Sequence, residues 1–305
     1  MSDQQTRGSL SRSLVLLTCA TIASCCLATG CETTSSRTKA AAPLDPQADA
    51  FSQLGYKLDW RGFAFVDRNQ KPRFMEPMGD VLAFQETGST LTIVEASNGG
   101  VRWSNKLAGP LTLFTAPVRE GRTVHASAET ELFTLALDTG TLVGRESFER
   151  VITTRPVQDG DLLIYGTSVG EVMAHVRGMG VKLWGFRMTG AIERPAVKIG
   201  PVVGVVSQSG DTVILEASTG SLLGRTKLFG GLTTDPVTDG SMMFVACSDQ
   251  SLYGIDPDGA RIRWRIRTSA PLTVQPSVVN GTLYCELPDR GLCAIDPATG
   301  SVKWE

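Results

Sequence analysis

Residues 291–304 have the sequence GLCAIDPATGSVKW, in which two short strand-like runs, LCAI and SVKW, flank the turn DPATG. The aspartate of such a turn can hydrogen-bond to the backbone ahead of it, and the glycine accepts a positive φ. Upstream, residues 282–287 (TLYCEL) alternate like a strand and follow Asn280-Gly281, a tight-turn dipeptide. With the short run at 277–280, four strands and three turns fit into about 40 residues, which is the content of one β-propeller blade.

Two residue types repeat along the chain with this same period. A proline and a glycine each recur about every 40 residues over six periods. Such a period with strand-like content predicts an all-β fold, a β-propeller of four-stranded antiparallel blades. We expect it to occupy residues 51–305, with six blades and seven as the alternative. The repeat prolines are Pro77, Pro117, Pro156, Pro195, Pro236 and Pro276, and the repeat glycines are Gly99, Gly140, Gly180, Gly220, Gly259 and Gly300.

Four tryptophans share one position in the repeat, shortly after the glycine: Trp103, Trp184, Trp264 and Trp304. A large aromatic at a fixed structural position is expected to pack one blade against the next, and a ligand cage is the alternative. A fifth, Trp60, precedes Trp103 by about one period. Residues 54–66 are therefore predicted to form a strand that lies beside the last blade and closes the ring.

The repeat resembles the PQQ-type propeller repeat, whose consensus runs roughly D-G-x-L-Y-A-L-D-x-x-T-G-x-x-x-W. Residues 291–304 and 251–264 match it best, and the resemblance covers about residues 53–305. The repeat implies the propeller fold but no single activity, because many unrelated functions use this fold.

The N-terminal region reads as a targeting segment. Residues 1–30 resemble a lipoprotein signal peptide, with an apolar stretch at 14–27 that is too short to span a membrane comfortably. The sequence LATGC before and at Cys31 resembles a bacterial lipobox, which implies acylation of Cys31; a plain cleaved signal with an incidental cysteine is the alternative. Residues 31–50, rich in Thr, Ser, Ala and Pro, are expected to be a disordered tether. The protein is thus expected to be lipid-anchored in the cell envelope.

Composition argues against several kinds of site. The formal net charge is −2, and no basic patch indicates nucleic-acid binding. The only histidines, His125 and His175, each lie in a strand pattern, which leaves almost no material for a histidine metal site or a serine triad. Cys285 and Cys293 flank one turn; a disulfide is possible, and two free buried thiols are favoured. No cofactor and no metal are therefore expected.

Three functions remain open. A quinoprotein dehydrogenase would follow from the PQQ-type repeat, but those families have eight blades and large insertions, neither of which is visible here. A non-catalytic scaffold is favoured, because anchor and repeat type together resemble the BamB family of outer-membrane protein assembly. That resemblance implies an envelope protein partner such as the β-barrel assembly machinery, at the outer membrane facing the periplasm. A binder of envelope glycan is the third, and it lacks clustered exposed aromatics.

A candidate interaction face follows from the repeat itself. The residue before each repeat proline has the same structural position in its blade, so a ring should bring all six to one mouth of the central channel. We call these six residues the collar. Their charges are mixed, and arginine is enriched at interfaces because its planar fork pairs with carboxylates; ordinary solvated strand starts are the alternative. The collar consists of Glu76, Ala116, Arg155, Arg194, Asp235 and Gln275.

Overall fold

The structure, a computed structural model, describes residues 52–64, 66 and 70–305. The chain divides into two compact units, Met1–Lys57 and Leu58–Glu305, and every strand among the described residues lies in the second. Cys31, the expected signal peptide and the expected tether lie outside the described residues. No helix in the described part of the chain is long and apolar enough to cross a membrane.

Six four-stranded antiparallel sheets make up the described part of the second unit, each built from four consecutive strands. We number them as blades 1 to 6. Blade 1 contains β1 (Pro72–Met78), β2 (Val81–Glu86), β3 (Thr90–Glu95) and β4 (Val101–Lys106). Blade 2 contains β5 (Val118–Glu120), β6 (Thr123–Ser127), β7 (Glu131–Ala136) and β8 (Leu142–Ser147). Blade 3 contains β9 (Val157–Asp159), β10 (Leu162–Gly166), β11 (Glu171–Val176) and β12 (Val181–Arg187). Blade 4 contains β13 (Val197–Ile199), β14 (Val202–Val206), β15 (Asp211–Glu216) and β16 (Leu222–Lys227). Blade 5 contains β17 (Val237–Thr238), β18 (Met243–Cys247), β19 (Ser251–Asp256) and β20 (Arg261–Arg267), with the short 3-10 helix η1 (Asp258–Ala260) before β20. Blade 6 contains β21 (Ser277–Val279), β22 (Thr282–Leu287), β23 (Gly291–Ile295) and β24 (Val302–Trp304).

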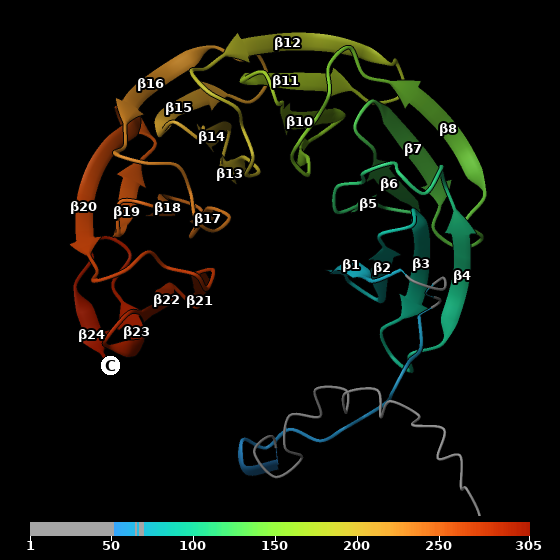
Figure 1. The fold of residues 1–305 in the computed structure, drawn as a ribbon, viewed down its shortest axis with the longest axis horizontal. Helices are drawn as coiled ribbons and strands as arrows, with labels where there is room; N and C mark the ends of the chain where they lie inside the picture. Colours follow the sequence, from blue (N-terminus) through green and yellow to red (C-terminus); the bar gives the residue numbers. More distant parts are fainter. Residues whose placement is uncertain (1–51, 65, 67–69) are drawn as a thin grey trace, which may run out of the picture. The chain divides into compact units, whose positions relative to one another are not determined.

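The blades follow one another along an arc within this unit (Figure 1). The first strand of each blade lies on the inner side of the arc and the fourth strand on the outer side, as β17 and β20 illustrate (Figure 1). The all-β propeller predicted from the repeat is thus observed, with six blades. The repeat prolines lie within β1 or one or two residues before the other inner strands, so the collar residues stand in or just before these strands.

The turn before each fourth strand explains the repeat glycine. In blade 4 the amide of Gly220 donates to the carbonyl of Glu216 at 2.8 Å, and Gly220 has φ +71°, a conformation that glycine adopts without strain. The indole of Trp184 from blade 3 lies against this glycine, so that an added Cβ would stand 2.6 Å from Trp184 Cδ2. Glycine is therefore required here both by the backbone and by the packing.

Three of the repeat tryptophans join neighbouring blades in this way. Trp103 donates its indole N–H to Leu137 O at 2.7 Å, and Trp184 donates to Ala217 O at 3.0 Å. Trp264 does the same to a proline carbonyl, Pro297 O, at 2.7 Å. Each acceptor stands three residues before the glycine that the ring covers, so the contact repeats with the sequence.

Trp304 does not follow this pattern. Its side chain belongs to the last blade, is 49 % exposed, and packs on Tyr284 of the same sheet with ring centroids 6.0 Å apart. The expectation that it packs blade against blade is therefore wrong, because no following blade presents a turn to it within the described residues.

The apolar core lies between blades rather than inside them. Each buried cluster draws its side chains from two consecutive blades: Ile93 and Phe133 belong to one that joins blades 1 and 2, and Val213 and Trp184 to one that joins blades 3 and 4. Because each blade depends on its neighbours for burial, the arc is held together step by step.

The predicted closing strand is not formed. Residues 56–64 have no regular secondary structure, and Trp60 donates its indole N–H to Ala96 O of blade 1 at 2.8 Å. Its ring also contacts Gly99, so Trp60 binds the first blade as the other tryptophans bind the blade that follows them. The prediction that this segment lies beside the last blade is wrong, and the first and last blades stand apart in Figure 1. The indole ring of Trp60 instead contacts the glycine turn that is nearest along the chain, the turn at Gly99 in blade 1.

The cysteines of the blades are free and buried, as the favoured alternative predicted. Cys285 and Cys293 are direct partners across β22 and β23. Burial raises the pKa of Cys285 to about 12, so this thiol stays protonated at neutral pH.

Candidate functional site

The collar contains two ion pairs that join different blades. Arg155 Nη1 stands 3.6 Å from Glu76 Oε2, and this pair links blade 3 to blade 1. Arg194 Nη1 stands 3.2 Å from Asp235 Oδ1, and its Nη2 donates to Thr233 O at 2.9 Å. Ala116, the collar residue of blade 2, has a small side chain, which leaves room for Arg155 to reach across to Glu76.

Five of the six collar residues line one hollow of about 380 Å³. The exception is Gln275, which is exposed and does not line this hollow. The sequence placed Gln275 in the same structural position as the others, but position within a blade does not decide which neighbours a residue has. Because the arc is open, the sixth blade does not face the first as it would in a closed ring (Figure 1).

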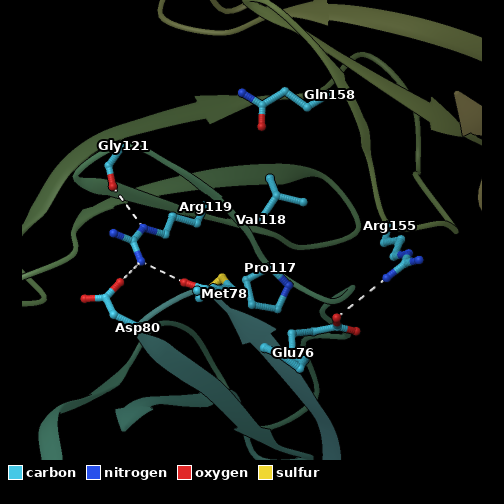
Figure 2. A pocket seen from close by; sticks show the side chains of 11 residues that line it. Glu76, Met78, Asp80, Pro117, Val118, Arg119, Gly121, Arg155 and Gln158 are labelled. Carbon is cyan, nitrogen blue, oxygen red and sulfur yellow. Dashed lines mark hydrogen bonds and ion pairs between the residues drawn. The ribbon is translucent and has the colours of Figure 1, made fainter. Parts of the chain in front are cut away.

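A second hollow, of about 680 Å³, adjoins the first, since Glu76 and Arg155 line both. Figure 2 shows that the side chain of Arg119 lies across it and donates to Met78 O at 2.7 Å and to Gly121 O at 3.0 Å. Arg119 also forms an ion pair with Asp80, which couples blade 2 to blade 1.

The electrostatics of the two hollows are mixed in sign. The hydrogen bond from Arg119 lowers the pKa of Asp80, which is therefore ionised at neutral pH. Burial lowers the pKa of Arg73, and the negative charge of Glu129 opposes that effect. The site thus presents fixed cations beside fixed anions, an arrangement suited to a partner of alternating charge.

The collar arginines keep much of their surface in water. The Arg155 side chain is 44 % exposed and that of Arg194 is 42 % exposed. An exposed ion pair contributes only about 0–1 kcal/mol to stability, because solvent screens it. Each guanidinium has five N–H donors, more than its intramolecular partners use, so it can bind a further carboxylate or carbonyl.

Sequence reasoning missed Arg119 and Asp80, although the repeat carried a signal for such residues. Asp80 is the third residue after its repeat proline, and so are Asp159 and Lys198. Lys198 Nζ lies 2.6 Å from Asp159 Oδ1, a second ion pair between consecutive inner strands. Comparing this position across blades would have found Asp80 in a row of charges, although not Arg119, which stands one position earlier in its blade.

The described residues offer no cluster of side chains that could bind a metal ion. They contain no group of three or more His, Cys, Asp or Glu side chains placed to hold a metal ion. His125 and His175 lie in β6 and β11, as the strand pattern predicted, and both are buried.

Comparison with known families agrees with the repeat. The family model described as "Outer membrane protein assembly factor BamB" matches residues 62–186 and 169–305. The chain belongs to this family. Its match spans all six blades, so the BamB family model and the observed sheets describe the same region of the chain.

Solved structures show the same fold at low identity. The crystal structure of BamB from Moraxella catarrhalis has a TM-score of 0.57 and 20 % identity, over 72 % of this chain and 70 % of that one. The computationally designed protein Ika8 has a TM-score of 0.66 and 11 % identity, over 77 % of this chain and 74 % of its own. A search of curated proteins finds no match. At these identities the structural similarity concerns the fold, and the family assignment rests on the family model.

Proposed function

We propose that this protein is a non-catalytic, lipid-anchored scaffold of the bacterial envelope, and that its collar docks a protein partner in outer-membrane protein assembly. The observation that carries the proposal is the pair of half-exposed arginines, Arg155 and Arg194, in a hollow of the inner face. Membership of the BamB family supports the link to outer-membrane assembly. The description of the family suggests the process, outer-membrane protein assembly, and the collar is the surface that we propose binds the partner.

The collar is tested by the double substitution Arg155→Ala and Arg194→Ala in the full-length chain. Affinity capture from detergent-solubilised envelope is followed by identification of the co-purified proteins. We expect the wild type to retain components of β-barrel assembly and the double variant to lose at least about tenfold of that capture, since hot-spot arginines contribute about 2 kcal/mol or more each. The melting temperature should hardly change, because exposed ion pairs add little stability.

A matched control uses two arginines with similar exposure on an outer strand. Arg261 and Arg263 of β20 are 59 % and 55 % exposed and both pair with Asp256. Their double alanine variant should capture partners like the wild type. Equal capture by a folded collar variant contradicts the proposal, and so does a quinone chromophore in the purified protein, which would indicate a dehydrogenase.

Membrane attachment is proposed to depend on Cys31. Two or three acyl chains would supply about 0.8 kcal/mol per buried methylene, which is enough for stable anchoring. The substitution Cys31→Ala should move the protein from the membrane fraction to the soluble envelope fraction. Sedimentation of that variant with membranes in high salt would contradict the anchor.

A further inference from the structure

One junction between blades differs from the others in what fills it. In blade 3 the fourth strand places Trp184 opposite Ala174, and in blade 1 it places Trp103 opposite Ile93. In blade 2 the same register places Gly144 opposite Thr134. The ring that covers the next blade's turn after blades 1, 3 and 5 is therefore missing between blades 2 and 3, because the sequence has glycine there.

Blade 4 also has a glycine at this position, and there the space is filled by the neighbouring main chain. A Cβ added to Gly224 would collide with backbone atoms of Gly259 and Ala260, because the turn of blade 5 lies directly against the strand. At Gly144 the nearest atoms to such a Cβ are Thr134 Cβ at 3.5 Å and Thr134 Oγ1 at 3.8 Å, both ordinary contacts. Neither Gly144 nor Gly224 has a positive φ, so the two sites differ in space and not in backbone strain.

The space beside Gly144 is a cavity of about 310 Å³. We call it the Gly144 slot. Its wall includes His125 and Thr134, whose side chains are joined by a hydrogen bond of 3.1 Å between Nδ1 and Oγ1. The register equivalents in blade 3 are Ile164 and Ala174, which are apolar and lie in the cluster that Trp184 completes. The slot is thus polar and holds no ring, whereas the junction of blades 3 and 4 is apolar and filled by Trp184.

The mouth of the slot is held in a fixed arrangement by ion pairs and backbone contacts. Arg177 pairs with Glu120 and, at 3.0 Å, with Asp161. Glu146 accepts from Gly178 N at 2.9 Å and lies 2.8 Å from His175 Nε2. Arg177 Nη1 also stands 3.4 Å from His125 Nε2, and both side chains are largely buried, so the guanidinium covers the His125 end of the slot.

The turn of blade 3 has the same groups that hold an indole ring at the junctions after blades 1, 3 and 5. Gly180 is the repeat glycine, with φ +69°, and an added Cβ would meet only Glu146, at 3.9 Å. Arg177 is the residue three before it and is the equivalent of Leu137 and Ala217, whose carbonyls accept the indole N–H. The amide of Arg177 donates to Asp161 O at 3.0 Å, as the amide of Ala217 donates to Pro201 O at 3.0 Å, so the carbonyl is in the same place in its turn.

We propose that the Gly144 slot binds a tryptophan side chain of a partner protein, in the place that the protein's own tryptophan occupies at the junctions after blades 1, 3 and 5. The ring would lie between Gly144 and the turn of blade 3, with its N–H donated to the carbonyl of Arg177. The guanidinium of Arg177 adds an attraction to the ring face. The inference rests on the proposed function only in that the ring belongs to a protein partner, and it does not involve the collar.

The first test compares Gly144→Trp with Gly224→Trp in the full-length protein. A ring that fits the slot should leave the melting temperature of Gly144→Trp equal to or above that of the wild type. Gly224→Trp must displace the turn of blade 5 and should melt several degrees lower. Equal destabilisation of the two variants, or failure of Gly144→Trp to fold, overturns the proposal because the slot would then not admit a ring.

The second test measures binding of N-acetyl-tryptophanamide by saturation-transfer NMR, with N-acetyl-leucinamide as the control ligand. The wild type and the collar double variant should both transfer saturation to the indole protons, whereas Gly144→Trp should not, because its own ring occupies the slot. No transfer with the wild type, or equal transfer with Gly144→Trp, overturns the proposal. Since the collar variant keeps its slot, failure of the proposed function and failure of this inference give different results.

Discussion

Truncation of Trp184 tests whether the joints between blades stabilise the arc as described. Trp184 is 8 % exposed, covers Gly220, and donates to Ala217 O at 3.0 Å. Replacing a buried tryptophan by alanine costs about 3–5 kcal/mol, and an acceptor left without its donor adds about 1 kcal/mol. We therefore expect Trp184→Ala to lower the free energy of unfolding by about 4 kcal/mol and the melting temperature by about 10 °C.

Trp304 offers a matched control, because it has the same position in its blade and is 49 % exposed. Trp304→Ala should cost only about 1 kcal/mol. Trp184→Phe retains a ring but loses the indole N–H, so it should fall between the two. Unfolding is followed by circular dichroism in urea and on heating. If Trp304→Ala is as destabilised as Trp184→Ala, the burial of the ring against the next blade is not the source of the stability.

Three further predictions concern single positions. Gly220→Ala should cost at least about 2 kcal/mol more than Gly281→Ala in urea unfolding, because both have positive φ but only Gly220 lies against a ring; equal costs would show that backbone strain alone matters. Burial, aided by the charge of Arg177, lowers the pKa of His125 from 6.5 to about 4. As the pH falls, the imidazole therefore takes up its proton in the unfolded chain before it does so in the folded one. About 3 kcal/mol of the unfolding free energy, present in full above pH 6.5, should be lost as the pH falls to 4. His125→Gln should flatten that part of the pH profile of unfolding free energy, and an unchanged slope would count against a neutral buried imidazole. Cys285, whose pKa is raised to about 12, should resist iodoacetamide at pH 8 until denaturant is added, as peptide mass spectrometry can follow; rapid labelling of the folded protein would contradict its burial.

Much of the fold could be predicted because the same residue types recur at the same positions in six successive units. The pattern reveals the features that need a particular residue type: the turn glycines, the prolines near the inner strands, and tryptophans such as Trp184. The acceptor of the indole N–H is a backbone carbonyl, which any residue provides, so the hydrogen bond to Ala217 O left no trace in the sequence. The blades could be predicted from local pattern, whereas their joints depend partly on groups that every residue shares.

What could not be predicted depends on which segments meet in space. Trp60 was recognised as a repeat tryptophan, but its partner is the first blade and not the last. Gln275 shares a sequence position with Arg155 but not its surroundings. The pairing of His175 with Glu146 across two blades was equally invisible, because the two residues stand far apart in the sequence. Local pattern fixes the blade, and only the assembled arc decides which side chains become neighbours.

The joint between Trp184 and Gly220 has a consequence for how such chains grow. Each unit of about 40 residues carries a turn glycine, and blades 1, 3 and 5 also carry a ring that covers the glycine of the unit after them. A duplicated copy of blade 3, inserted after itself, would present Gly180 to the preceding Trp184 and a second Trp184 to Gly220. Both halves of every new joint would be supplied by the copied segment. Gain of a whole blade therefore needs no compensating mutation, whereas gain of half a blade leaves a ring without its turn.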